Sequence, residues 1–198
     1  MLGVPVAETV EAREGKIRGA CLEVSQLVND WRSRAVGGME TALMLWESCC
    51  IPSLLNGAGT WTDITSETEK KLNKTQSWFL RLVFQIGQGA PLASLLWDSG
   101  FLEMGLRIKI EKLLLVLHIR NLTENSLARQ IYEEQKKLNW PGLAAETAAI
   151  CLELNIEDCN STKMSKCDYK QIVVRACHLQ KFGKALCLRQ CKMRGDSI

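Results

Sequence analysis

Apolar residues recur at helical spacing along almost the whole chain, and this periodicity constrains the fold more than any other feature. In residues 7–34, Val10, Ile17, Val24 and Trp31 recur every seven residues. Such spacing places side chains on one face of an α-helix. Apolar and polar residues nowhere alternate cleanly over six residues, which is the pattern of a half-buried strand. The sequence therefore predicts an all-α fold, an irregular multi-helix bundle of about seven or eight helices.

Residues that begin and end helices divide the rest of the chain. Ser66 and Glu69 have the spacing of a capping box, in which each side chain binds a backbone N–H of the first turn. We expect Pro52 to kink or end the second helix, Gly87 and Gly89 to stop the third, and Asn125 to cap the sixth. The predicted helices cover residues 7–34, 66–86, 91–99, 103–121 and 126–138. The second begins near Met39 and includes Leu54 on its apolar face if Pro52 kinks it rather than ends it. A seventh begins at Pro141 and a last one at Ser165, where Ser165 and Asp168 form a capping pair.

Two helices carry specific expectations about burial. In the third, Leu72, Phe79, Val83 and Ile86 are expected to face inward. The fifth, residues 103–121, is apolar on most sides, so we expect it to be central and buried, with His118 as a core residue.

Composition limits the class of protein. The chain has 198 residues, 46% of them hydrophobic and 24% charged, as in ordinary globular proteins. The longest purely apolar run, residues 113–117, is far shorter than the ~20 residues of a membrane span, and the N-terminus has no secretory pattern. Nine cysteines, an odd number lying mostly in apolar helical stretches, favour free thiols over a disulfide framework. We therefore expect an intracellular protein that does not enter membranes.

Positive charge is concentrated near the C-terminus. The net charge of +3 consists of +7 from residue 163 onward and −4 before it. A stretch with few acidic residues can neutralise phosphates and release counterions. The predicted phosphate-contacting residues of this stretch are Lys163, Lys166, Lys170, Arg175, Lys181, Lys184, Arg189, Lys192 and Arg194.

A second basic set lies on the third predicted helix. Lys70, Lys74 and Arg81 have i, i+4 and i+11 spacing, which forms a ridge, and Trp78 lies beside it. The alternative interpretation of both basic sets is a solvated surface that keeps the protein in solution.

Catalytic and metal-binding patterns are weak. Cys187 and Cys191 are one helical turn apart and follow Cys177 and His178, but zinc sites usually pair cysteines across a short knuckle in a loop. Glu157 and Asp158 lie in a polar loop without a preceding strand, so we interpret them as a solvated turn. The sequence contains no Gly-rich phosphate loop. We therefore predict no catalytic residues, no metal ligands and no cofactor.

Several segments, in order, resemble the region after the catalytic palm of non-LTR (LINE-type) retrotransposon reverse transcriptases. Residues 51–61 (IPSLLNGAGTW) resemble that family's LP-x-LL-x-G-x-x-x-W segment, and residues 72–81 (LNKTQSWFLR) resemble its L-x-x-x-Q-x-x-F-L-R helix. The turn at 87–91, the segment ASLLWDSG at 93–100, RIKIEKL at 107–113 and SLAR at 126–129 follow as in the family. The resemblance covers most of residues 8–180. It implies the thumb and the helices beyond it, which in the family grip the primer–template and help to position RNA.

The chain departs from that family in two respects. The family's aromatic-x-Asp-Asp motif is absent, since the sequence contains no Asp-Asp pair, and its zinc knuckle is also missing. These departures suggest a truncated or decaying copy of such an element. The resemblance divides the chain into a linker helix (1–36), a thumb-like core (37–122) and a C-terminal helical region with a basic tail (123–198).

The resulting functional hypothesis is a non-catalytic helical module that binds RNA or DNA. The alternative is a structural or protein-interaction domain, or a non-functional fragment of a decayed element. In that case apolar surface around Trp31, Trp46 and Trp61, left without the palm, would be exposed and would favour self-association.

Overall fold

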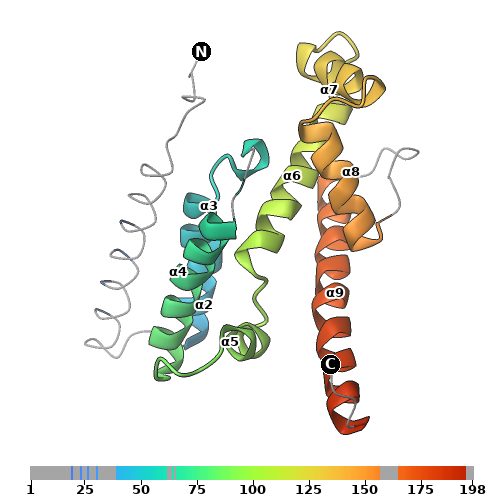
Figure 1. The fold of residues 1–198 in the computed structure, drawn as a ribbon. Helices are drawn as coiled ribbons and strands as arrows, with labels where there is room; N and C mark the ends of the chain where they lie inside the picture. The colour runs from blue at the N-terminus through green and yellow to red at the C-terminus, as the bar shows by residue number, and fades with distance from the viewer. Residues whose placement is uncertain are drawn as a thin grey trace. The chain divides into compact units, whose positions relative to one another are not determined.

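The computed structural model describes residues 39–61, 64, 66–156 and 165–194, with side chains only as far as Gln180, together with the isolated residues 19, 23, 26 and 30. Helices and turns account for most of these residues and none forms a strand, so the predicted all-α class is confirmed (Figure 1). The predicted helix 7–34 lies outside the described residues except at those four isolated positions. No helix among the described residues is both long and apolar enough to cross a membrane.

The chain divides into two compact units. The first contains the helices from Met39 to Gly57 and from Ser66 to Gly105, and the second contains the turn at residues 58–61 and everything described from Leu106 onward. The boundaries predicted at residues 36 and 122 do not coincide with this division, because most of the central helix belongs with the helices that follow it.

The first unit begins with an interrupted helix. Helix α2 (Met39–Leu45) continues into a π-helical turn (Trp46–Cys50) and then into the short α3 (Ile51–Leu54). In the π-turn the N–H of Ile51 donates to the carbonyl of Trp46, five residues back. Pro52 has no N–H to donate to the carbonyl four residues back. A shift in the pattern of backbone hydrogen bonds beside a proline is a usual consequence. The helix therefore does not end at Pro52, which was one of the two predicted effects. Its hydrogen-bond register changes in the turn before this residue, and the helix continues to Leu54.

Helix α4 (Ser66–Phe84) contributes part of the core of this unit. Leu72, Phe79 and Leu80 are fully buried, and Phe79 stacks on Trp46 with ring centroids 4.2 Å apart and planes 8° from parallel. Helix α5 (Leu92–Ser99) contributes Leu95 and Leu96, and it ends at Gly100 in the left-handed conformation, as the sequence predicts. Trp46 is thus a core residue, contrary to the hypothesis that it is exposed.

Polar residues of α4 hold the start of the central helix. The Asn73 side-chain oxygen accepts the backbone N–H of Met104 at 3.0 Å, and the Gln76 amide nitrogen donates to the carbonyl of Leu102 at 3.1 Å. Gln76 is completely buried. The first bond satisfies one of the backbone N–H groups that a helix start otherwise leaves without a partner, and the second holds the segment just before the helix. Two residues one helical turn apart on α4 therefore set where the helix that begins at Met104 starts.

Helix α4 ends before the predicted glycines. Gln85 adopts φ of 56°, and the N–H of Ile86 donates to the carbonyl of Arg81 at 3.1 Å, as in a Schellman ending. The helix therefore ends at Phe84, three residues before Gly87, and Ile86 is exposed rather than inward-facing as predicted. Asn139 and Asn155 end two later helices in the same left-handed conformation. Ser66 and Glu69 lie in the first turn of α4, and their capping hydrogen bonds stay a prediction.

The strained ending of α4 gives a stability prediction. A non-glycine residue in the left-handed region costs ~1 kcal/mol or more, which glycine avoids. We expect Gln85→Gly to raise the free energy of unfolding by ~0.5–1 kcal/mol. Chemical denaturation of this variant beside Gln85→Ala would check it, because alanine keeps the strain. An equal effect of both substitutions would contradict the explanation.

The second unit is built around α6 (Met104–Asn121). Ile108, Ile110, Leu113, Leu114, Val116 and Leu117 are all buried, so the prediction of a helix buried on most sides is confirmed. The prediction for His118 is wrong, since this residue is exposed. Helices α7 (Leu127–Lys137), α8 (Leu143–Leu154) and α9 (Lys166–Arg194) complete the unit.

A small core joins three of these helices. Tyr132 of α7 packs with Val116 of α6 and Ala144 of α8, and Ile119 and Leu143 cover the edges. The guanidinium of Arg120 lies 5.8 Å from the centre of the Tyr132 ring, within the range of a cation–π contact. One face of α7 is therefore fixed against its neighbours.

The predicted starts of these three helices agree with the structure for α9 but not for α7 and α8. The N-cap of α7 is Ser126, whose side chain makes no capping bond, so the prediction for Asn125 is wrong. Helix α8 begins at Leu143 instead of Pro141, because Gly142 takes the cap position. The prediction for α9 is confirmed: the N–H of Asp168 donates to Ser165 Oγ at 3.1 Å, and that hydroxyl donates to the Asp168 carboxylate at 2.7 Å.

Candidate nucleic-acid interface

The predicted ridge on α4 is only partly a surface feature. Lys70 and Lys74 are exposed, one turn apart, and Trp78 follows one turn later and is 38% exposed. Neither lysine is paired with a carboxylate of the described residues, whereas their neighbour Lys71 forms an ion pair with Glu67 at 3.4 Å. Two lysines and an aromatic residue thus lie along one exposed stripe.

Arg81 has a different place. Its Nη2 donates to the carbonyl of Ala90 at 2.8 Å, and its Nε is buried without a hydrogen-bond partner in the described part of the chain. The side chain therefore holds the turn between α4 and α5. The sequence grouped Arg81 with the lysines because helical spacing gives the face of a residue but does not show which loop folds back on it.

The basic C-terminal stretch is helical from Lys166 onward. Lys166, Lys170 and Arg175 are exposed on α9, while Tyr169, Val173 and Cys177 form its buried row. Arg175 is nine residues from Lys166, which places it half a turn around the helix axis. The described cations therefore do not form a single line along α9.

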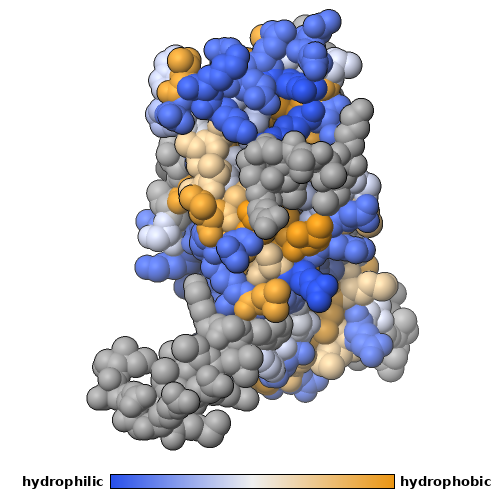
Figure 2. Space-filling model, turned by 90° about the vertical axis from the view of Figure 1, so that its right-hand side faces the viewer, coloured by the Kyte–Doolittle hydropathy of each residue, from blue (hydrophilic) through white to orange (hydrophobic). Residues whose placement is uncertain are grey.

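The other predicted basic residues of the C-terminal stretch have no described side chains. Lys181, Lys184, Arg189, Lys192 and Arg194 lie on the α9 backbone beyond the described side chains, and Lys163 lies outside the described residues. Apolar residues interrupt the exposed face of α9, since Ile172 and Leu179 are also exposed. Figure 2 shows such apolar residues among polar ones on the face that α8 and α9 present.

Charged residues that the sequence did not single out hold α8 against α6. Lys112 of α6 is only 6% exposed and forms an ion pair with Glu146. Three residues earlier, Lys109 Nζ lies 2.6 and 2.8 Å from the two carboxylate oxygens of Glu153, which also accepts from Gln180 of α9 at 3.4 Å. A signal for these pairs was available, because Lys109 and Lys112 interrupt an otherwise apolar helix on one face.

Removing one or the other partner of the Lys112–Glu146 ion pair should change stability by different amounts. Glu146→Gln leaves the Lys112 ammonium buried without its carboxylate, so we expect a loss of ~2–4 kcal/mol in the free energy of unfolding. Lys112→Met removes the buried charge and leaves a carboxylate that water can reach, so its cost should be ~1 kcal/mol or less. Denaturant unfolding of both variants would compare them. A larger loss for Lys112→Met would show that the ion pair itself is strongly stabilising.

Five cysteines have described side chains. Cys49, Cys50, Cys151, Cys167 and Cys177 are not in disulfides. No group of three or more His, Cys, Asp or Glu side chains within the described residues could hold a metal ion. Burial raises the pKa of Cys177 to about 11, against a smaller opposite effect of Lys109, so this thiol stays protonated at neutral pH. The side chains of Cys187 and Cys191 lie beyond the described ones.

The buried thiol makes stability depend on alkaline pH. The Cys177 pKa is about 11 in the folded protein, whereas an unperturbed cysteine thiol has a pKa of 9.0. The unfolded chain therefore ionises first, and the stability due to the neutral thiol is present below pH 9 and is lost as the pH rises toward 11. We expect Cys177→Ala to have a flatter stability profile than the wild type between about pH 8 and pH 10.5, as measured by urea unfolding.

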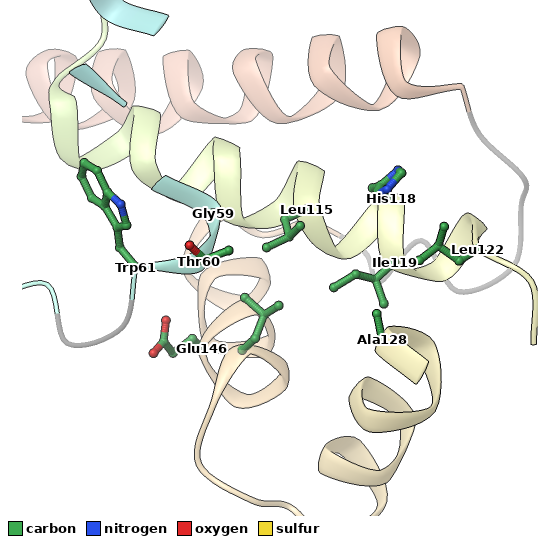
Figure 3. Close-up of a pocket in the computed structure, with 10 residues that line it drawn as sticks. Gly59, Thr60, Trp61, Leu115, His118, Ile119, Leu122, Ala128 and Glu146 are labelled. Atoms are coloured by element: carbon green, nitrogen blue, oxygen red, sulfur yellow. The ribbon is translucent and has the colours of Figure 1, made fainter. Parts of the chain in front are cut away.

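An apolar cavity of about 440 Å³ lies within the second unit (Figure 3). The turn at residues 58–61 forms one wall, and Gly59 permits its close approach to α6, because a Cβ there would lie 3.0 Å from the carbonyl of Glu111 and from Leu115 Cβ. Glu146 brings a carboxylate to the edge. The lining residues are Gly59, Thr60, Trp61, Leu115, His118, Ile119, Leu122, Ala128, Leu143 and Glu146. Trp61 is 8% exposed, so the hypothesis that it is exposed is wrong, and Trp31 lies outside the described residues.

No family model, no curated protein and no solved structure matches this chain.

Proposed function

We propose that this protein is a non-catalytic helical module that binds single-stranded RNA or DNA. The observation that carries the proposal is the exposed stripe Lys70–Lys74–Trp78 on α4, which combines two cations without carboxylate partners among the described residues and an aromatic ring. Cations that follow a strand and aromatic rings on which bases stack are the usual components of sites for single-stranded nucleic acids.

Helix α9 supports the same proposal from the second unit. Lys166, Lys170 and Arg175 point to solvent, and the acidic residue in the first turn, Asp168, is engaged with Ser165. This helix would add sequence-independent contacts to phosphates, which dominate nonspecific affinity. Specific base recognition would have to come from elsewhere.

We further propose that the module descends from the thumb region of a non-LTR retrotransposon reverse transcriptase. The positions that carry the resemblance have defined places in the fold. Leu72, Gln76 and Phe79 are buried on α4, Arg81 binds the turn before α5, and Trp61 packs in the second unit. A motif whose members serve packing is what a retained helical scaffold would keep, and this supports descent without supporting any retained activity.

The principal test measures binding of fluorescent single-stranded RNA and DNA at several salt concentrations. For Lys70→Gln/Lys74→Gln we expect roughly tenfold weaker binding at low salt. The negative slope of log K against log salt should become shallower by ~1.4, which corresponds to the loss of two phosphate contacts. The matched control is Lys71→Gln/Lys136→Gln, which removes the same number of positive charges. Lys71 is on α4 and is paired with Glu67, and Lys136 is on α7. The control should change affinity by less than about twofold.

Trp78→Ala separates stacking from charge. Its removal should weaken single-stranded binding by ~1–3 kcal/mol while leaving the salt slope unchanged. Binding by the wild type without salt dependence, or equal losses in the control and the Lys70/Lys74 variant, would contradict the proposed interface.

A further inference from the structure

Helix α7 carries an apolar stripe that faces solvent. Leu127, Ile131 and Leu138 lie at i, i+4 and i+11, on one face of the helix, and they are 70%, 50% and 62% exposed. Trp140 follows the helix and is 62% exposed. Single exposed apolar residues are ordinary, but large apolar residues gathered at both ends of one exposed helix face favour an interaction surface.

The backbone holds this stripe in a fixed form. Asn139 takes the left-handed conformation with φ of 49°, and the N–H of Trp140 donates to the carbonyl of Gln135 at 3.1 Å. This Schellman ending fixes the position of Trp140 relative to the last turn of α7. On another face of the helix, Tyr132 is buried against Val116 and Ala144, so the stripe cannot turn inward without losing that core.

The charged residues beside the stripe can pair with the same residues of a second copy. Glu134 and Lys137 lie on the same flank and already form an ion pair within the helix at 2.9 Å. In an antiparallel pair of identical helices related by a twofold axis, each flank meets the same flank of the other copy. With the axis close to Gln135, Glu134 of each copy lies opposite Lys137 of the other.

The same register matches the apolar residues. Leu138 of one copy then lies between Ile131 and Glu134 of the other, and Trp140 lies over the turn that contains Leu127 and Ile131. Apolar residues concentrated at the two ends of the stripe therefore meet each other instead of polar surface. We propose that the protein forms a twofold symmetric dimer in which α7 pairs antiparallel with α7 of a second copy.

The size of the surface sets the strength that we expect. Specific stable interfaces bury ~1,600 Å² in total, and one helix with four large apolar residues supplies less. The dimer should therefore be weak and reversible, with a dissociation constant on the order of 10 µM. This inference does not depend on nucleic-acid binding, and it is tested in the absence of nucleic acid.

Two single charge reversals provide the decisive experiment. Glu134→Lys places lysine opposite lysine, and Lys137→Glu places glutamate opposite glutamate, so each variant of the full chain should dimerise about tenfold more weakly than the wild type, as measured by sedimentation equilibrium. Mixed in equal amounts, the two variants face each other with opposite charges, and the mixture should recover association close to that of the wild type.

The mixture also controls for damage to the fold, because a variant that had lost its structure could not be rescued by the other. Asp98→Lys, an exposed reversal in the last turn of α5, should leave association unchanged. Ile131→Ser should weaken association without rescue by either charge variant. A wild type that stays monomeric at several hundred micromolar, or a mixture that associates no better than its components, would overturn the proposal.

Discussion

The second unit depends on the burial of one charge. Lys112 lies in the middle of a helix that is apolar on most sides, where an ammonium group without a partner would be costly. Glu146 must therefore lie against it, and this requirement places α8 beside α6. Lys109 and Glu153 repeat the contact farther along in the antiparallel direction, and Gln180 of α9 joins the same carboxylate. The orientation of three helices follows from these pairs.

The same arrangement decides which surfaces remain for function. On α9, Tyr169, Val173 and Cys177 are buried, whereas Lys166, Lys170 and Arg175 are exposed. Because α7 buries Tyr132, its stripe of Leu127, Ile131 and Leu138 is left outside. In the first unit, Arg81 binds the following turn, while Lys70 and Lys74 stay free of carboxylates in the described part of the chain. A basic residue thus becomes a candidate ligand for phosphate only when packing does not use it.

The proposed nucleic-acid site and the proposed dimer place different demands on the chain. The α4 stripe and α9 need cations open to solvent and depend strongly on salt, since phosphate contacts release counterions. The α7 pairing needs apolar contact, with charges that mainly select the register. The two activities use different helices and different chemistry, so variants can separate them.

Helical periodicity by itself determined the all-α class, the central buried helix and the approximate extent of most helices, because apolar spacing reports one helix face whatever lies opposite. The residue types at helix ends also determined the Ser165–Asp168 cap and the end of α5 at Gly100, because these are local interactions. Only the tertiary structure decided that Arg81 binds a turn, that His118 is exposed, that Trp46 and Trp61 are buried, and that Lys112 meets Glu146. Each of these depends on residues distant in the chain, and the spacing within a single helix contains no information about what packs against it.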